Sequence, residues 1–190
     1  MKHFLMLAAL LAGTFCMADN LLVNSDMKTN KGWSLWGSAP KDKEIRAKLL
    51  TYVNEGPNGE RVLKFEDCCT DFNPYLIQFV PVSDVTAETQ FKLTFSLKAE
   101  KGQVVPITLQ MSAPDPDNPG KTKYAGACTS KGRIVGTGEW KQYEMSFSKP
   151  KPGLAKVGVA FYPVAKPWGD ENKKLTGSFL LADVSLEQVK

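Results

Sequence analysis

The stretch QFKLTFSLK, residues 90–98, decides the fold. Polar residues alternate in it with four apolar residues, which are Phe91, Leu93, Phe95 and Leu97. Successive side chains of a β-strand point to opposite faces of a sheet. This period of two therefore predicts a strand with one buried face and one solvated face.

Similar short runs recur along the chain. The run YLIQFVPV, residues 75–82, is apolar on both sides, as expected of a central strand. Further runs are found at residues 45–53, 61–65, 104–111, 140–147, 154–162 and 178–189. Turn-rich breaks such as SAPDPDNPG and KPWGDEN separate the runs, and no ten-residue window shows helical periodicity. The pattern predicts an all-β fold, an antiparallel two-sheet β-sandwich of jelly-roll type.

One of these strands indicates where a ligand could bind. Val157, Val159 and Phe161 alternate with Gly158 and Ala160, so the two small residues share the opposite face. Small side chains are expected to leave that face shallow and open, which suits a groove.

The first 18 residues have the features of a secretory signal peptide. Lys2 gives a basic start, residues 4–12 are apolar, and Cys16-Met17-Ala18 fits a cleavage site with small residues. We therefore expect residues 1–18 to be removed and the protein to be secreted, either extracellular or periplasmic.

Two alternatives for this segment are disfavoured. A membrane span takes about 20 apolar residues, more than this run provides. A lipoprotein signal needs a small residue before the lipidated cysteine, whereas bulky Phe15 precedes Cys16. The remaining residues, 19–190, are expected to form one domain with no membrane span.

The composition excludes several classes of function. The formal net charge is +4, and the lysines are scattered, so nucleic acid is not an expected partner. The one histidine, His3, lies in the predicted signal peptide. The mature chain therefore lacks the histidine that Ser-His-Asp and Cys-His nucleophiles and HExxH zinc sites require.

Four segments in order carry a resemblance to a known family. They are NLLVNSDMKTNKGWSLWG at 20–37, YLIQFVPVSDVTAETQFKLTFSLKA at 75–99, GEWKQYEMSF at 138–147 and GSFLLADVSL at 177–186. Together they resemble carbohydrate-binding modules of families 4, 9, 16 and 22 over almost the whole mature chain. The resemblance implies a galactose-binding-like β-sandwich that binds a polysaccharide, such as a β-glucan, without cleaving it and without a cofactor. Such modules usually accompany secreted polysaccharide hydrolases, so a separate glycan-degrading enzyme is an expected partner.

The resemblance also implies which residues bind the sugar. Trp36 matches a sugar-stacking aromatic of some relatives, Tyr124 matches a second, and Gln78 lies on a strand that often supplies a polar contact. Trp33 is expected to hold the N-terminal turn instead. The alternative for each aromatic is an ordinary packed ring.

The other two tryptophans receive different predictions. Trp168 lies in the charged, proline-bounded segment KPWGDEN, where a ring is less easily buried, and is a third binding candidate. Trp140 matches a core ring of the family and is expected to be structural.

A metal is not expected. Relatives commonly have a Glu where Lys28 stands and an Asp where Ala182 stands, and only Asp183 remains of the closing acidic pair. A lysine ammonium repels a cation, and calcium requires six to eight oxygen ligands. A second candidate group consists of Asp115, Asp117 and Asn118. It lacks the remaining acids of a calcium loop, so a solvated turn is the favoured interpretation.

Three cysteines remain after removal of the signal peptide: Cys68, Cys69 and Cys128. Adjacent strand residues point to opposite faces, so at most one of Cys68 and Cys69 can meet Cys128. We expect one disulfide from Cys128 to either of them, with a vicinal Cys68–Cys69 bridge as the less favoured alternative.

Two rival functions remain open at this point. A small jelly-roll glycoside hydrolase or lyase would need facing acids or a base, and three residues could contribute carboxylates: Glu66, Asp67 and Asp71. Nothing fixes their separation, so surface charge is the simpler interpretation. An envelope or adhesion domain that has lost sugar binding is the second rival.

Overall fold

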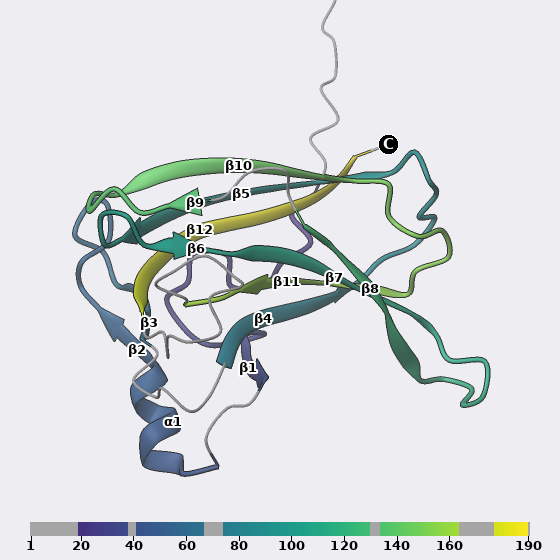
Figure 1. The fold of residues 1–190 in the computed structure, drawn as a ribbon, viewed down its shortest axis with the longest axis horizontal. Coiled ribbons are helices and arrows are strands. Elements are labelled where there is room, and N and C mark those ends of the chain that lie inside the picture. Colours follow the sequence, from purple (N-terminus) through teal and green to yellow (C-terminus); the bar gives the residue numbers. More distant parts are fainter. Residues whose placement is uncertain (1–18, 38–40, 67–73, 130–133, 164–176, 190) are drawn as a thin grey trace, which may run out of the picture.

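The computed structural model describes residues 19–37, 41–66, 74–129, 134–163 and 177–189, and Figure 1 shows two packed layers of strands. Sheet A contains, in spatial order, β1 (Ser34–Gly37), β4 (Pro74–Pro81), β11 (Lys156–Phe161), β7 (Ile107–Pro114) and β8 (Thr122–Thr129). Sheet B contains β10 (Lys141–Ser148), β5 (Gln90–Ala99), β12 (Ser178–Val189), β3 (Val62–Glu66) and β2 (Leu50–Val53). Two short strands, β6 (Val104–Val105) and β9 (Ile134–Val135), pair with each other.

All the strand pairs formed by these residues are antiparallel. Neighbours within a sheet come from distant parts of the chain, as in β4, β11 and β7 of sheet A. Successive strands thus cross between the two layers, which is typical of a jelly roll. The predicted all-β, two-sheet antiparallel sandwich is confirmed.

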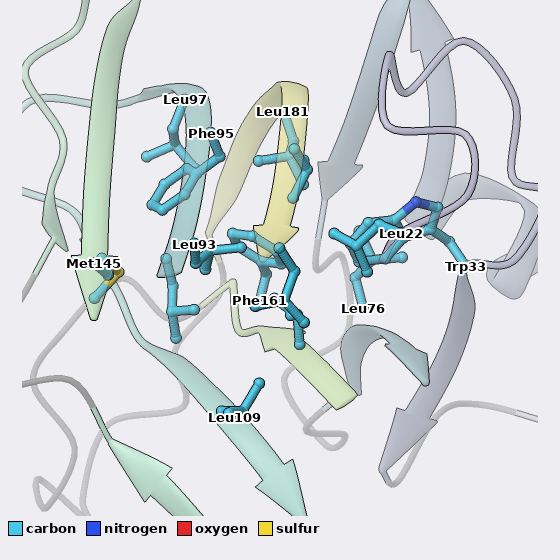
Figure 2. Close-up of a cluster of buried hydrophobic side chains, with 14 of the residues drawn as sticks. Leu22, Trp33, Leu76, Leu93, Phe95, Leu97, Leu109, Met145, Phe161 and Leu181 are labelled. Atoms are coloured by element: carbon cyan, nitrogen blue, oxygen red, sulfur yellow. The ribbon is translucent and has the colours of Figure 1, made fainter. Parts of the chain in front are cut away.

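The core lies between the sheets and follows the predicted alternation. On β5 all four apolar residues of the 90–98 stretch are at most 1% exposed. Phe95 packs edge-on against Phe161 of sheet A with ring centroids 5.4 Å apart, and Figure 2 shows both rings among core leucines. Burying such rings removes large apolar areas from water, which is the main favourable contribution to folding.

The predicted strand at residues 45–53 is wrong in its first half. Residues Lys43–Leu49 form helix α1, and only Leu50–Val53 form a strand, β2. Asp42 caps the helix, because its carboxylate accepts hydrogen bonds from the backbone N–H groups of Glu44 and Ile45 at 2.7 and 3.3 Å. The sequence KEIRAKL consists mostly of good helix formers. Its seven residues are too few for a ten-residue search for helical periodicity.

The N-terminal segment, residues 19–33, binds to sheet B through its backbone. The Leu21 N–H donates to the carbonyl of Leu186 on β12, and the Val184 N–H donates to the carbonyl of Ser25, both at 2.8 Å. The side-chain oxygen of Asn20 accepts from the Leu186 N–H at 3.0 Å. The segment therefore continues sheet B beyond its regular strands.

The same segment is fastened to sheet A by one buried amide. Gln78 on β4 is 1% exposed, and its side chain pairs with both backbone groups of Val23. The Val23 N–H donates to Oε1 at 2.7 Å, and Nε2 donates to the Val23 carbonyl at 3.0 Å. Gly32 covers this pair with φ at +82°, and a Cβ there would lie 2.5 Å from a Val23 methyl group. Because glycine tolerates this φ value and has no Cβ, the segment can turn tightly here before β1 begins.

The places of the family's calcium-associated residues are occupied differently. The Lys28 ammonium lies 3.4 Å from an Asp26 carboxylate oxygen. Ala182 is 1% exposed and packs with Val62 and Leu180. In the described part of the chain, no cluster of three or more His, Cys, Asp or Glu side chains could hold a metal ion.

We predict that the Gln78→Ala substitution lowers the free energy of unfolding by about 2 kcal/mol, because it leaves the Val23 N–H and carbonyl without partners. Urea denaturation measures the loss. Gln142→Ala, which removes an exposed side chain from β10, is the control and should cost less than about 0.5 kcal/mol. Equal losses for the two variants would contradict the role given to Gln78.

We also predict that EDTA leaves the melting temperature unchanged. A bound calcium ion would stabilise the native state by mass action, and its removal would lower the melting temperature. Differential scanning calorimetry with and without EDTA makes the comparison. A drop that added calcium reverses would show that other oxygens hold a metal.

Candidate functional site

The strands of sheet A turn one set of side chains to the core and the alternate set outward. Leu76, Val80, Val157 and Val159 belong to the core cluster between the sheets. The strand register then places the alternate residues together on what we call the outer face of sheet A: Ser34, Trp36, Tyr75, Ile77, Phe79, Thr108, Gln110, Ser112, Tyr124, Lys156, Gly158 and Ala160. This face collects the aromatic candidates that the sequence indicated.

Trp36 is half exposed on edge strand β1. Its side chain is 49% exposed, and its ring lies 5.3 Å from that of Phe79, tilted by 57°. Next to it, Tyr75 stacks on Tyr162, with ring centroids 4.8 Å apart. The supporting rings restrict the motion of Trp36, so one end of the outer face presents a fixed aromatic surface.

The small residues of β11 support these rings rather than form an open floor. A Cβ on Gly158 would lie 2.7 Å from the Phe79 ring and 2.9 Å from Ile77. Ala160 is fully buried and packs with Ile77 and Tyr162. The prediction of a shallow face at Gly158 and Ala160 is therefore wrong: the side chains of β4 lie across them.

The middle of the outer face is polar and uncharged. Gln110 donates a hydrogen bond from Nε2 to the Tyr162 hydroxyl at 3.3 Å. The Thr108 hydroxyl is buried and has no hydrogen-bond partner among the described residues. Lys156, opposite Ser112, carries the one charge that the register places on these five strands' outer face.

Tyr124 lies at the other edge of the same face. It is 67% exposed on β8 and lies opposite Ser112. Four inter-strand steps of about 4.8 Å, or about 19 Å, separate β1 from β8. Trp36 is level with Tyr75 and Tyr124 with Pro81, which adds about 20 Å along the strands and places the two residues about 28 Å apart. Trp36 and Tyr124 therefore share a face but not a contact, and a ligand that touches both must cross the whole sheet.

Gln78 and Trp33 lie on the opposite side of sheet A from Trp36. The Gln78 amide points inward and pairs with Val23, so neither polar atom reaches the outer face. The period of two along β4 groups Gln78 with the buried residues Leu76 and Val80, and this is the sequence signal for its inward side chain. Trp33 is 5% exposed, and its ring centroid lies 6.1 Å from that of Phe161. Figure 2 shows both side chains in the core cluster.

Of the two remaining tryptophans, the structure describes Trp140. Trp140 packs against Leu180 and Ala182 on the outer face of sheet B, and its indole N–H donates to the Glu55 carbonyl at 2.8 Å. Its ring is thus structural, although it lies outside the core between the sheets. Trp168 lies outside the described residues.

Cys128 is a free thiol, not half of the predicted disulfide. Its Sγ lies 3.8 Å from the Met111 sulfur, toward the core, and burial raises its pKa. The proposed partners Cys68 and Cys69 lie outside the described residues, as do Asp67 and Asp71.

The acidic turn between β7 and β8 is bonded within itself. Asp115 accepts a hydrogen bond from the Asn118 side chain at 2.8 Å, and that bond contributes most to lowering its pKa. Lys123 lies 3.9 Å from Asp115 and 4.0 Å from Asp117. The Lys123 ammonium group supplies the positive charge that a metal ion would otherwise bring to these carboxylates.

No family model matches the chain, and no curated protein matches it in sequence. Solved structures share its fold. The enzymatically active domain of bacteriophage CBA120 tailspike protein 4 aligns with a TM-score of 0.55 and 13% identity over 90% of this chain, but only 21% of that one. The described chain thus spans a fraction of the tailspike.

Two carbohydrate-binding modules align over nearly their whole length. The CBM22-2 xylan-binding domain of Paenibacillus barcinonensis Xyn10C gives a TM-score of 0.51 and 19% identity, covering 86% of this chain and 96% of that one. The family 11 module of Clostridium thermocellum was solved in complex with a β-1,3-1,4-mixed-linked tetrasaccharide. It aligns with a TM-score of 0.52 and 12% identity, covering 88% of this chain and 94% of that one. The chain therefore has the β-sandwich fold of carbohydrate-binding modules, as its sequence resemblance predicted.

Proposed function

We propose that this protein is a secreted, non-catalytic module that binds a polysaccharide across the outer face of sheet A. The observation that carries the proposal is the half-exposed Trp36 ring, supported from behind by Phe79. The axial C–H groups of a glucopyranose make an apolar face of ring size. Stacking that face on Trp36 removes apolar area from water and leaves the equatorial hydroxyls free.

Polar groups of the same face complete the argument for a sugar chain. Gln110 and Ser112 lie between the two exposed aromatics and can exchange hydrogen bonds with hydroxyl groups. Tyr124 offers a second ring at the diagonally opposite corner of the face, about 28 Å away. This arrangement suits several consecutive sugar units rather than one.

A β-glucan or a related polysaccharide is the ligand class that the comparisons support best. One module of this fold was solved with a mixed-linked β-glucan tetrasaccharide and another is described as xylan-binding. Backbones of both kinds present flat pyranose faces, the shape that an aromatic ring accepts.

The rival functions have less support. A glycoside hydrolase needs two carboxyl groups about 5 to 10 Å apart, and the strands described here place no carboxylate on the outer face of sheet A. Glu66 lies on sheet B in an ion pair with Lys64 at 2.6 Å. An adhesion domain without sugar binding would not need an exposed Trp36 on a supporting ring.

Export is part of the proposal, on the support of the signal-like residues 1–18. In the described part of the chain no helix is long and apolar enough to cross a membrane. Outside the cytoplasm the module would act by itself or beside a separate glycan-degrading enzyme.

We predict that Trp36→Ala and Tyr124→Ala each lower affinity for the polysaccharide about thirtyfold, or about 2 kcal/mol, because each removes a stacking surface. Isothermal titration calorimetry on the best oligosaccharide from a glycan array measures the loss. Both side chains are exposed, so the melting temperatures should stay close to that of the parent.

Trp33→Ala is the comparison variant, because it removes a buried ring three residues before Trp36. It should lower the free energy of unfolding by about 3 kcal/mol because its ring is buried in the core. Once folded, this variant should retain more affinity than Trp36→Ala. Parental affinity in both Trp36→Ala and Tyr124→Ala would place the binding site elsewhere.

A further inference from the structure

A hollow lies between β1, the outermost strand of sheet A, and helix α1. Figure 1 shows α1 at the same end of the sandwich as β1. Polar and cationic residues of both elements and of the preceding turn line the hollow: Asn30, Trp33, Ser34, Lys43 and Arg46. The function proposed above does not use this hollow.

Among the described residues that line the hollow, the two charged ones are both positive. Lys43 and Arg46 stand three residues apart on α1, so both side chains lie on one face of the helix. None of the described lining residues carries a carboxylate, and neither cation forms an ion pair with another described residue. Asp42 is engaged in capping α1 through two backbone N–H groups.

The hollow also supplies hydrogen-bond donors. Trp33 is 5% exposed, and its indole N–H is buried without an acceptor among the described residues. An indole N–H can only donate, and an unpaired buried donor is costly. The Ser34 hydroxyl and the Asn30 amide line the same space. A hollow with hydrogen-bond donors and two cations among its described lining residues suits an oxyanion. The guanidinium group of an arginine can bind such an anion through paired hydrogen bonds.

The hollow adjoins the proposed sugar platform. Ser34 and Trp36 are alternate residues on β1, so they share a face and stand about 7 Å apart. A sugar stacked on Trp36 therefore lies within reach of the hollow for a charged substituent. Lys156, across Ser112 from Tyr124, provides a cation toward the other end of the same face.

We propose that the hollow between β1 and α1 binds an anionic substituent, a carboxylate or a sulfate ester, of the polysaccharide that stacks on Trp36. The proposal rests on the function proposed above and narrows it to acidic glycans. Lys43 and Arg46 supply the charge, and Ser34 and Asn30 supply hydrogen bonds.

Calorimetry with three forms of one backbone tests the proposal. The probes are a mixed-linked β-glucan oligosaccharide, its sulfated derivative, and the same oligosaccharide oxidised at C6 to uronates. We expect an anionic form to bind about tenfold more tightly than the neutral form, and the difference to shrink at high salt. The form with the larger gain identifies sulfate or carboxylate as the group bound.

Matched variants locate the effect on α1. Arg46→Gln and Lys43→Gln keep helix propensity nearly unchanged, and each should reduce the preference for the anionic form severalfold while leaving the neutral affinity unchanged. Lys48→Gln makes the same charge change on the same helix outside the hollow and should retain the full preference. An equal reduction in Lys48→Gln would overturn the proposal, because it would show a general effect of net charge.

A titration with inorganic sulfate separates failure of the hollow from failure of the glycan site. In nitrogen-15 NMR spectra, sulfate should shift the Trp33 indole signal of the parent, and Arg46→Gln should abolish the shift. If the neutral oligosaccharide binds, the anionic forms bind no tighter and sulfate moves no Trp33 signal, the inference fails and the proposed function stands. If sulfate shifts Trp33 but no oligosaccharide form binds, the hollow stands as an anion site and the proposed function fails.

Discussion

The buried pairing of the Gln78 amide with the Val23 backbone is the contact on which the candidate site depends. A buried amide is costly unless both its donor and its acceptor are satisfied, and Val23 satisfies both. Because residues 20–25 are also bonded to β12, this pairing joins the two sheets through the N-terminal segment. From there the chain places Trp33 in the core and Trp36 on the surface.

The two sides of the chain at β1 explain why two tryptophans three residues apart differ. Trp33 packs on Phe161 between the sheets, whereas Trp36 packs on Phe79 outside them. The glycine at position 158 leaves room for the Phe79 ring, so a small residue on β11 supports an exposed ring on β1. Across the face the chemistry then changes from rings at β1 to hydroxyl and amide groups on β7, with cations toward both ends.

The sequence predicts the fold better than the site because strand alternation is local. Residues 90–98 show their buried face directly, and the exposed positions of Trp36 and Tyr124 agree with candidate binding roles that stay predictions. Helix α1 was missed because its seven residues give too short a periodic signal. The hollow is lined by residues of distant segments, such as Trp33 and Arg46, and no pattern in either segment indicates that they line one space. Gln78 pairs with Val23 instead of reaching the outer face, and its neighbours Leu76 and Val80 mark its side of β4 as buried.

The most direct test of the account is chemical-shift mapping of the nitrogen-15-labelled protein with the tightest-binding oligosaccharide. The account predicts that the largest changes fall on the outer face of sheet A, at the Trp36 indole and at the backbone of β1, β7 and β8. Changes gathered instead on the outer face of sheet B, around the hollow lined by Lys64, Lys98 and Leu180, would contradict it.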